Sequence, residues 1–456
     1  MRRFTALMAA FLLLAGLAGC SHSEKDSPFQ FTVTDGKAEL TRYTGSAGEV
    51  EIPASFEGSP VTSIGARALY NSTSLKTVIL PESVTSIGQE AFALCPSLTA
   101  FQVPEENTAY TAKDGVLYSR DGTVLVACPE GTAGEYTVPS GVKTIADQAF
   151  SRCLKLTSIT LPEGITAIGA AAFYDCTKLT TLTIPDSVES IGATAFCRCA
   201  ALKSITLPKG LTTFETGLFS DCTALESLTI PDGLTTMGQA VFWNCTALSA
   251  FKTNDNPTYM AEDGVLLSRD RTRLIRYPAG KKGDAYTLPA TVTALAEEAF
   301  SYNTLLKSID LPGRLKTVPE SAFYQCTGLE KVTVGEGIAS IGDKAFGTCK
   351  ALKTLRLPST LKTIGEGAFN NCDTLKTVKL PEGLTAIGGE AFSYCDALKT
   401  ITIPSGVTSI GITAFGGCEN LRLYGQPDSE AAAYAEREDI PFNDNDKTAT
   451  TTTAKK

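Results

Sequence analysis

Residues 361–395 read LKTIGEGAFNNCDTLKTVKLPEGLTAIGGEAFSYC and contain one unit twice. In each copy an Ile-Gly pair is followed by Ala-Phe and then by Cys, and the second copy repeats the first after 23 residues. A unit this short cannot bury its apolar face alone. A fixed period of this size therefore indicates a solenoid, in which each coil covers the next one.

The repeat extends over most of the 456-residue chain, and its aromatic position marks each coil. That position is occupied by Leu69, Phe92, Phe150, Phe173, Phe196, Phe219, Phe242, Phe300, Phe323, Phe346, Phe369, Phe392 and Phe415. Neighbouring members are 23 residues apart, except across two gaps of 58 residues. The sequence therefore predicts thirteen coils with two insertions, near residues 101–137 and 251–287.

Each coil is predicted to be β-rich. The pattern Leu-x-x-Ile-x-Leu predicts a short strand that a proline usually ends, because proline cannot extend a sheet ladder. A second extended stretch and a glycine turn follow. Ala-Phe is then expected in a tight helical turn, with the aromatic rings of successive coils stacked inside the solenoid. In both insertions, two short strands around a polar turn predict a β-hairpin. The fold class is a β-rich α/β solenoid.

Eleven of the fourteen cysteines lie three residues after the aromatic position of their coil. They are Cys95, Cys153, Cys176, Cys199, Cys222, Cys245, Cys326, Cys349, Cys372, Cys395 and Cys418, and the twelfth such position is Asn303. A position that accepts Cys or Asn predicts a buried polar ladder bonded to turn backbone. The ~4.8 Å spacing of stacked coils alone would also permit disulfides between neighbours. An unbroken row has no natural pairing, however, so free thiols are favoured.

The N-terminus has the features of a targeting segment. Arg2-Arg3 precede an apolar run, and Leu17-Ala18-Gly19 lead to Cys20. This arrangement predicts a bacterial lipoprotein signal with lipid attached to Cys20, and the alternative is an ordinary cleaved signal peptide. The expected division is a signal peptide at 1–19, a lipidated tether at 20–28, an N-terminal cap at 29–60, the solenoid at 61–423, a C-terminal cap at 424–442 and a disordered tail at 443–456.

Residues able to support catalysis are scarce. The single histidine is His22, in the tether, which removes most hydrolase triads and histidine-metal sites from the folded part. Cys197 and Cys199 suggest a zinc site, but Cys199 is explained more simply as a member of the cysteine ladder. Asp114 and Asp121 suggest a calcium loop, but the preference of Asp-Gly for turns explains them more simply. The sequence predicts no catalytic residue, metal or cofactor. The net charge of −9 argues against nucleic-acid binding.

The outward side chains of the Leu-x-x-Ile-x-Leu strands are expected to form two rows on a concave face. Most are Ser or Thr, which a solvated β-surface also favours. Positive charge gathers in the last coils of this acidic chain. The candidate ligand-binding residues are Lys353, Arg356, Lys376, Lys379, Lys399, Thr354 and Thr377. This basic end could dock acidic protein or glycan groups. Trp243, next to Phe242, is either an exposed anchor or a local packing choice.

The repeated unit, the Asp-Gly-Val-Leu hairpins and the closing Ile440-Pro441-Phe442 resemble the BspA-like leucine-rich repeat family of bacterial cell-surface proteins. The resemblance covers roughly residues 29–442. It implies a leucine-rich repeat superhelix, lipid-anchored in the cell envelope through Cys20 and exposed at the surface. It also implies adhesion to an extracellular protein or glycan, with no shared catalytic residues. The alternative is a structural or scaffolding lipoprotein without an external ligand.

Overall fold

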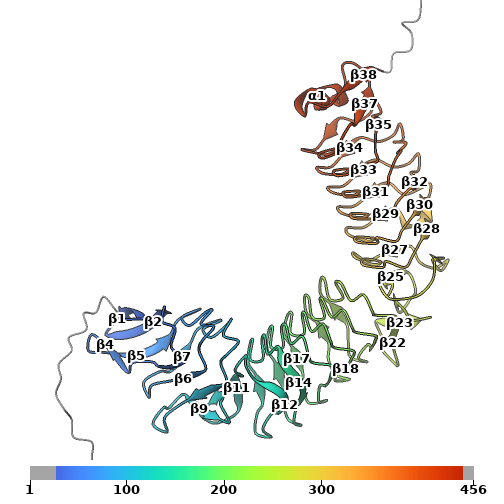
Figure 1. The fold of residues 1–456 in the computed structure, drawn as a ribbon. Helices are drawn as coiled ribbons and strands as arrows, with labels where there is room; N and C mark the ends of the chain where they lie inside the picture. The colour runs from blue at the N-terminus through green and yellow to red at the C-terminus, as the bar shows by residue number, and fades with distance from the viewer. Residues whose placement is uncertain (1–26, 445–456) are drawn as a thin grey trace, which may run out of the picture.

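The computed structural model describes residues 27–444 and shows a curved solenoid of stacked coils (Figure 1). Most coils contribute two short strands, which pair in parallel with the matching strands of neighbouring coils. Helix is almost absent from the described residues. The predicted fold class is confirmed. The predicted signal peptide, the lipidated Cys20, most of the tether and most of the tail lie outside the described residues.

One face of the solenoid, the long-strand face, carries the predicted Leu-x-x-Ile-x-Leu strands. It consists of β3 (Glu49–Glu51), β6 (Thr77–Ile79), β8 (Ala100–Gln102), β12 (Ala133–Thr137), β14 (Lys155–Thr160), β16 (Thr181–Thr183), β18 (Ser204–Thr206), β20 (Ser227–Thr229), β22 (Ala250–Lys252), β26 (Ala285–Tyr286), β28 (Ser308–Leu311), β30 (Lys331–Val334), β32 (Thr354–Arg356), β35 (Thr400–Thr402), β37 (Arg422–Gly425) and β38 (Phe442–Asp444). Strand β38 extends two residues into the segment predicted as a disordered tail.

The second extended stretch of each coil forms the short-strand face. It consists of β5 (Ser59–Ile64), β7 (Ser86–Ile87), β13 (Thr144–Ile145), β15 (Ala167–Ile168), β17 (Ser190–Ile191), β19 (Thr213–Phe214), β21 (Thr236–Met237), β27 (Ala294–Leu295), β29 (Thr317–Val318), β31 (Ser340–Ile341), β33 (Thr363–Ile364), β34 (Ala386–Ile387) and β36 (Ser409–Ile410). Its glycines allow close approach: a Cβ on Gly388 would lie 2.5 Å from the backbone nitrogen of Glu366 in the preceding coil.

Both ends of the stack are covered by other elements. At the N-terminus, β1 (Phe29–Thr34) and β2 (Lys37–Tyr43) pair antiparallel, β2 pairs in parallel with β5, and β4 (Ser55–Phe56) pairs antiparallel with β5. At the C-terminus, α1 (Glu430–Arg437) buries Tyr434 against Phe415, and the Phe415 backbone nitrogen donates to the Tyr434 hydroxyl. A 3₁₀ helix, η2, spans Gly313–Leu315.

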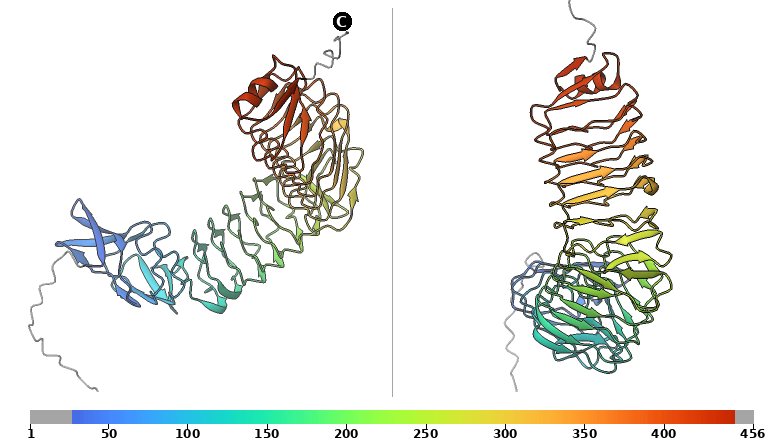
Figure 2. Two further views of the ribbon diagram at one scale, coloured as in Figure 1. Left: turned by 45° about the horizontal axis from the view of Figure 1, so that its top comes forward. Right: turned by 90° about the vertical axis from the view of Figure 1, so that its right-hand side faces the viewer.

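Each insertion has three strands, one more than the predicted hairpin. The first contains β9 (Tyr110–Lys113), β10 (Val116–Ser119) and β11 (Val124–Ala127), which pair antiparallel in sequence order before β11 joins β13 in parallel. The second repeats this order with β23 (Tyr259–Glu262), β24 (Val265–Ser268) and β25 (Arg273–Arg276), and β25 joins β27. The largest bend of the solenoid lies at the second insertion (Figures 1 and 2).

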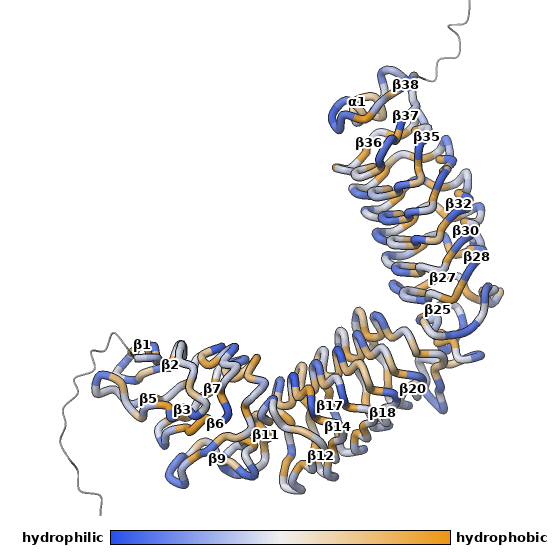
Figure 3. Tube along the Cα trace, viewed as in Figure 1, coloured by the Kyte–Doolittle hydropathy of each residue, from blue (hydrophilic) through white to orange (hydrophobic). Residues whose placement is uncertain are grey.

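The phenylalanines at the aromatic position form two stacks inside the solenoid, as predicted. From Phe150 to Phe242, neighbouring ring centroids are 5.2 to 6.1 Å apart. From Phe300 to Phe415 they are 4.7 to 5.5 Å apart. Figure 3 shows how hydrophobic residues recur along every coil. The Ala-Phe segment is a series of turns rather than a helical turn, because residues on both sides of it have positive φ angles. Around Phe392, these residues are Glu390 and Tyr394.

The cysteine ladder also forms as predicted. In eleven coils the Cys Sγ donates to a backbone carbonyl of the preceding coil, usually that of the aromatic residue, as from Cys176 to Phe150 over 3.1 Å. Asn303 takes the same role with its amide nitrogen, 3.0 Å from the carbonyl of Pro278. All thirteen cysteines within residues 27–444 are free thiols. Over the same residues, none of the helices has the length and apolarity to cross a membrane.

Candidate ligand-binding surfaces

The seven predicted ligand-binding side chains are all exposed on the long-strand face of the last coils. In the register of β30 and β32, Thr354 lies beside Lys331 and Arg356 beside Thr333, but strand pairing joins no two of the seven to each other. The predicted hydroxyl rows also form in the first part of the chain, where β16 pairs with β18. The rows are thus seen where neighbouring strands of this face pair.

The sheet is interrupted at the centre of this basic surface. The sequence predicts a strand at residues 375–380, yet no strand is found there, and the ladder stops at β32 and resumes at β35. Lys353, Lys376 and Lys399 occupy the same position of three successive coils, and Arg356 and Lys379 share another. Like charges directly opposite each other destabilise strand pairing. The same break occurs between β14 and β16 and between β18 and β20, where the equivalent positions carry no like charges, so repulsion does not by itself account for the interruption.

Salt bridges neutralise only part of the positive charge. Lys353 Nζ lies 2.9 Å from Glu330 Oε2, and Lys399 Nζ donates to the backbone carbonyls of Asp396 and Glu419. Within residues 27–444, Arg356, Lys376 and Lys379 have no carboxylate within salt-bridge distance. We call these three residues the basic face.

The basic face is not concave, so the sequence-based expectation of its shape was wrong. Strands β28, β30 and β32 lie on the outer side of the main bend, and β29, β31 and β33 lie nearer its inner side (Figure 1). The largest bend lies at the second insertion rather than within a run of identical coils. The strand pattern of a single coil therefore could not show which face would be on the inside.

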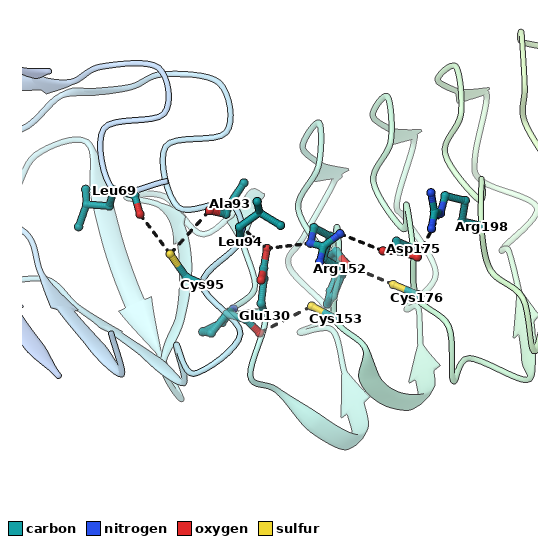
Figure 4. Close-up of polar contacts among 12 residues, drawn as sticks. Leu69, Ala93, Leu94, Cys95, Glu130, Arg152, Cys153, Asp175, Cys176 and Arg198 are labelled. Carbon is teal, nitrogen blue, oxygen red and sulfur yellow. Dashed lines mark hydrogen bonds and ion pairs between the residues drawn. The ribbon is translucent and has the colours of Figure 1, made fainter. Parts of the chain in front are cut away.

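A second candidate site lies at the first joint, the junction between the coils of Phe92 and Phe150. A cavity of about 880 Å³ opens there, with Phe92, Leu98 and Phe101 among its apolar lining residues. Charged side chains cross the junction (Figure 4). Glu130 is 7% exposed, and its Oε1 accepts a 2.8 Å hydrogen bond from the backbone nitrogen of Leu94. Arg152 Nε lies 3.7 Å from the same oxygen.

The charges continue along the turns beyond the joint. Arg152 Nη1 donates to Asp175 over 3.0 Å, and Arg198 Nε lies 3.4 Å from the other oxygen of Asp175. Arg152 Nε itself is buried and has no hydrogen-bond partner among the described residues. The first joint thus combines a cavity with both apolar and charged lining residues, a buried carboxylate and a guanidinium nitrogen without a hydrogen bond.

The second joint, between the coils of Phe242 and Phe300, is filled by the chain itself. Arg276 is 4% exposed, and its guanidinium donates to the carbonyl of Phe242 over 2.9 Å and to Ser301 Oγ over 2.9 Å. Trp243 stacks on Tyr324 with ring centroids 5.2 Å apart. Trp243 is therefore a packing residue that bridges the joint. The cavity there measures about 250 Å³.

Sequence reasoning missed the residues that hold the joints together. Asn107 and Asn256 are fully buried, and their side-chain nitrogens donate to two and three carbonyls of the preceding coil respectively. The shared motif Asn-x-x-Tyr at the start of both insertions was the available signal. Glu130 and Arg276 carried no such signal, because they occupy non-equivalent positions in the two insertions.

The alternatives of metal binding and thiol chemistry gain no support from the geometry. Asp121 Oδ1 accepts hydrogen bonds from Ser119 Oγ and the backbone of Thr123, which is turn chemistry. Burial raises the pKa of Cys197 to about 11 and that of Cys245 to about 12, so these thiols are poor nucleophiles. Within residues 27–444, no group of three His, Cys, Asp or Glu side chains is placed to hold a metal ion.

Glu130 should make stability depend on pH. Burial raises the pKa of its carboxyl above the ordinary 4.5, against the hydrogen bond from Leu94 and the charge of Arg152. Its contribution to stability is then complete below pH 4.5 and is lost as pH rises through the raised pKa. We expect Glu130→Gln to remove this loss, so that the melting temperature falls less between pH 4.5 and 7 than in the wild type. Exposed Glu105→Gln is the control, and identical pH profiles for Glu130→Gln and wild type would contradict the expectation.

Comparison with known proteins identifies the repeat. Residues 43–116, 132–260 and 286–422 match the family described as BspA type leucine rich repeat region (6 copies). The chain belongs to this BspA-type leucine-rich repeat family. It is similar to the crystal structure of a leucine rich cell surface protein from Faecalibacterium prausnitzii, with 31% identity, a TM-score of 0.56 and coverage of 90% of this chain and 96% of that one.

The pneumococcal vaccine antigen PcpA shares the fold, with 20% identity, a TM-score of 0.52 and coverage of 91% of this chain and 96% of that one. No curated protein matches. The BspA-type match leaves residues 117–131 and 261–285 uncovered, and these contain Glu130 and Arg276. The joints are thus where this BspA-type chain departs from its repeat.

Proposed function

We propose that this protein is a surface-anchored binding protein that recognises an extracellular protein or glycan through the long-strand face of its last coils. The observation that carries the proposal is the basic face: three exposed cationic side chains without salt bridges, on an acidic chain. Such a surface steers and orients acidic partners. The similarity to a bacterial cell-surface protein supports an extracellular setting.

The anchor that we propose is lipid on Cys20, with residues 1–19 removed as a lipoprotein signal peptide. The charged start, the apolar run and the Leu-Ala-Gly-Cys ending of the leader support it. The role that we propose is non-catalytic, and the family and the lack of histidine after His22 support it. Lipid anchoring leaves the solenoid free to meet a partner outside the membrane.

The test is a binding screen of the protein against immobilised matrix proteins and glycans at two salt concentrations. We expect saturable binding that weakens with salt, because exposed charges are screened. The variant Arg356→Glu, Lys376→Glu, Lys379→Glu should weaken binding by about tenfold or more. The matched control reverses three exposed lysines on the same face of the earlier coils: Lys155→Glu, Lys203→Glu, Lys252→Glu.

Equal effects of the two triple variants would assign the binding to net charge rather than to the basic face. No binding at all by a folded protein would favour the alternative, a scaffolding lipoprotein of the envelope. Circular dichroism of each variant provides the folding control.

A further inference from the structure

The first joint is a place where the turn of one coil is missing. In regular coils, three backbone nitrogens around the aromatic residue donate to carbonyls of the next coil. Gln148 donates to Ala170 over 2.9 Å, Phe150 to Ala172 over 2.7 Å, and Arg152 to Tyr174 over 2.7 Å. These bonds hold adjacent turns together along the solenoid.

The equivalent donors on the N-terminal side of the first joint are the nitrogens of Glu90, Phe92 and Leu94. Only Leu94 has a partner, the carboxylate of Glu130. In the part of the chain that the structure describes, no hydrogen bond is found for the nitrogens of Glu90 and Phe92.

On the opposite wall, the carbonyls of Asp147 and Ser151 occupy the acceptor positions, and they are also without partners among residues 27–444. Both sets of residues line the same cavity of about 880 Å³. One wall thus offers backbone donors and the other backbone acceptors, which are the two sides of an absent turn. Unpaired main-chain groups of this kind are a template for another chain.

The floor of the cavity is apolar. Phe92 is the only phenylalanine at the aromatic position that is half-buried within residues 27–444, whereas the others are at most 3% exposed. Its ring packs edge-on against Phe101, with centroids 4.9 Å apart. The cavity thus joins this aromatic floor to walls that also carry charged side chains, among them Glu130 and Arg152, and ligand sites commonly combine apolar surface with placed polar groups in this way.

The second joint shows which side chains can fill a cavity of this kind. Matching backbone bonds align Cys128 with Tyr277, since their nitrogens donate to Ala149 and Ala299 respectively. Ala127 therefore corresponds to Arg276. Ala93 corresponds to Trp243, because each directly follows the aromatic residue of its coil. Two alanines thus replace the two large side chains that fill the second joint, and the cavity is about 880 rather than 250 Å³.

We propose that the first joint binds a short peptide segment of a partner protein, whose main chain occupies the place of the missing turn and whose apolar or aromatic side chain packs on Phe92. A peptide supplies both the carbonyls and the N–H groups that the two walls require. The lining carries the carboxylates of Glu90, Glu130 and Asp147 against the guanidinium groups of Arg67 and Arg152, a balance that does not favour an anionic ligand such as a nucleotide.

This site is separate from the basic face, so either can fail without the other. The probe is an array of octapeptides that includes IGEGAFNN, the chain's own turn at residues 364–371, and the same peptide with serine in place of phenylalanine. A glycan array is run in parallel. The proteins are wild type, the variant Ala93→Trp with Ala127→Arg, and the triple variant of the basic face.

We expect saturable binding of phenylalanine-containing peptides, weakened at least about tenfold by the serine replacement and by the joint-filling variant. The triple variant of the basic face should bind them like wild type. Absence of peptide binding, or equal binding by the filled variant, would overturn the proposal. Capture of glycans alone, lost in the filled variant, would also overturn it.

Hydrogen exchange of the wild type supplies a second readout that does not depend on the folding of a variant. A bound peptide should slow exchange at the nitrogens of Glu90 and Phe92 and in residues 88–95 more than elsewhere. Protection confined to other coils would place the peptide outside the first joint and contradict the proposal.

Discussion

Replacing Phe369 with alanine is expected to lower the free energy of unfolding by roughly 3–5 kcal/mol, the usual cost of truncating a buried phenylalanine. Its ring is fully buried and stacks between Phe346 at 5.3 Å and Phe392 at 5.2 Å. The substitution leaves a cavity and also removes two aromatic contacts. In a solenoid each coil is stabilised by its neighbours, so the loss reaches the adjacent coils. Denaturant unfolding followed by circular dichroism measures it.

The chain contains a matched control for this substitution. Phe92 occupies the same position of its coil but is half-buried, and among the aromatic rings of residues 27–444 it packs against that of Phe101 alone. Phe92→Ala should therefore cost less, below about 2 kcal/mol, because less apolar surface returns to water. Equal losses for the two substitutions would show that stacking within the solenoid contributes little.

The features that recur in every coil could be predicted from the sequence. The period placed the phenylalanine stacks and the cysteine ladder correctly, because each contact joins equivalent residues of adjacent coils. Even the exception at Asn303 was informative, since Cys and Asn share only the ability to donate to turn backbone. Contacts of this kind join residues one period apart, so aligning the repeats of the chain with one another reveals them.

The contacts at the joints could not be predicted, because there the 23-residue period no longer indicates which residues are neighbours in space. The contact of Glu130 with Leu94 spans 36 residues, and that of Arg276 with Phe242 spans 34, neither of which is a multiple of the period. The bend that places the basic face on the outer side also arises at an insertion. The candidate surface was thus found by composition, whereas its shape and the cavity at the first joint required the structure.

Arg276→Met is expected to destabilise the protein by roughly 3–5 kcal/mol at pH 7, as breaking a buried charge pair does. Methionine fills much of the same volume but cannot donate to Phe242 or Ser301. It also leaves Glu298, 3.9 Å from the guanidinium, without its cation. Burial already raises the pKa of the Glu298 carboxyl, and the charge of Arg276 opposes that shift. Removing the arginine therefore raises this pKa further.

The sign of the pH dependence follows from that shift. A carboxyl with a raised folded-state pKa destabilises the fold most when it is ionised, so part of the loss in Arg276→Met should be recovered at pH 5. Denaturant midpoints at pH 5 and pH 7 measure the recovery. The control is Arg273→Met, because Arg273 is exposed on the same strand. A loss that is the same at both pH values would mean that Arg276 acts through its hydrogen bonds alone, and a loss no larger than that of the control would mean that the second joint does not depend on it.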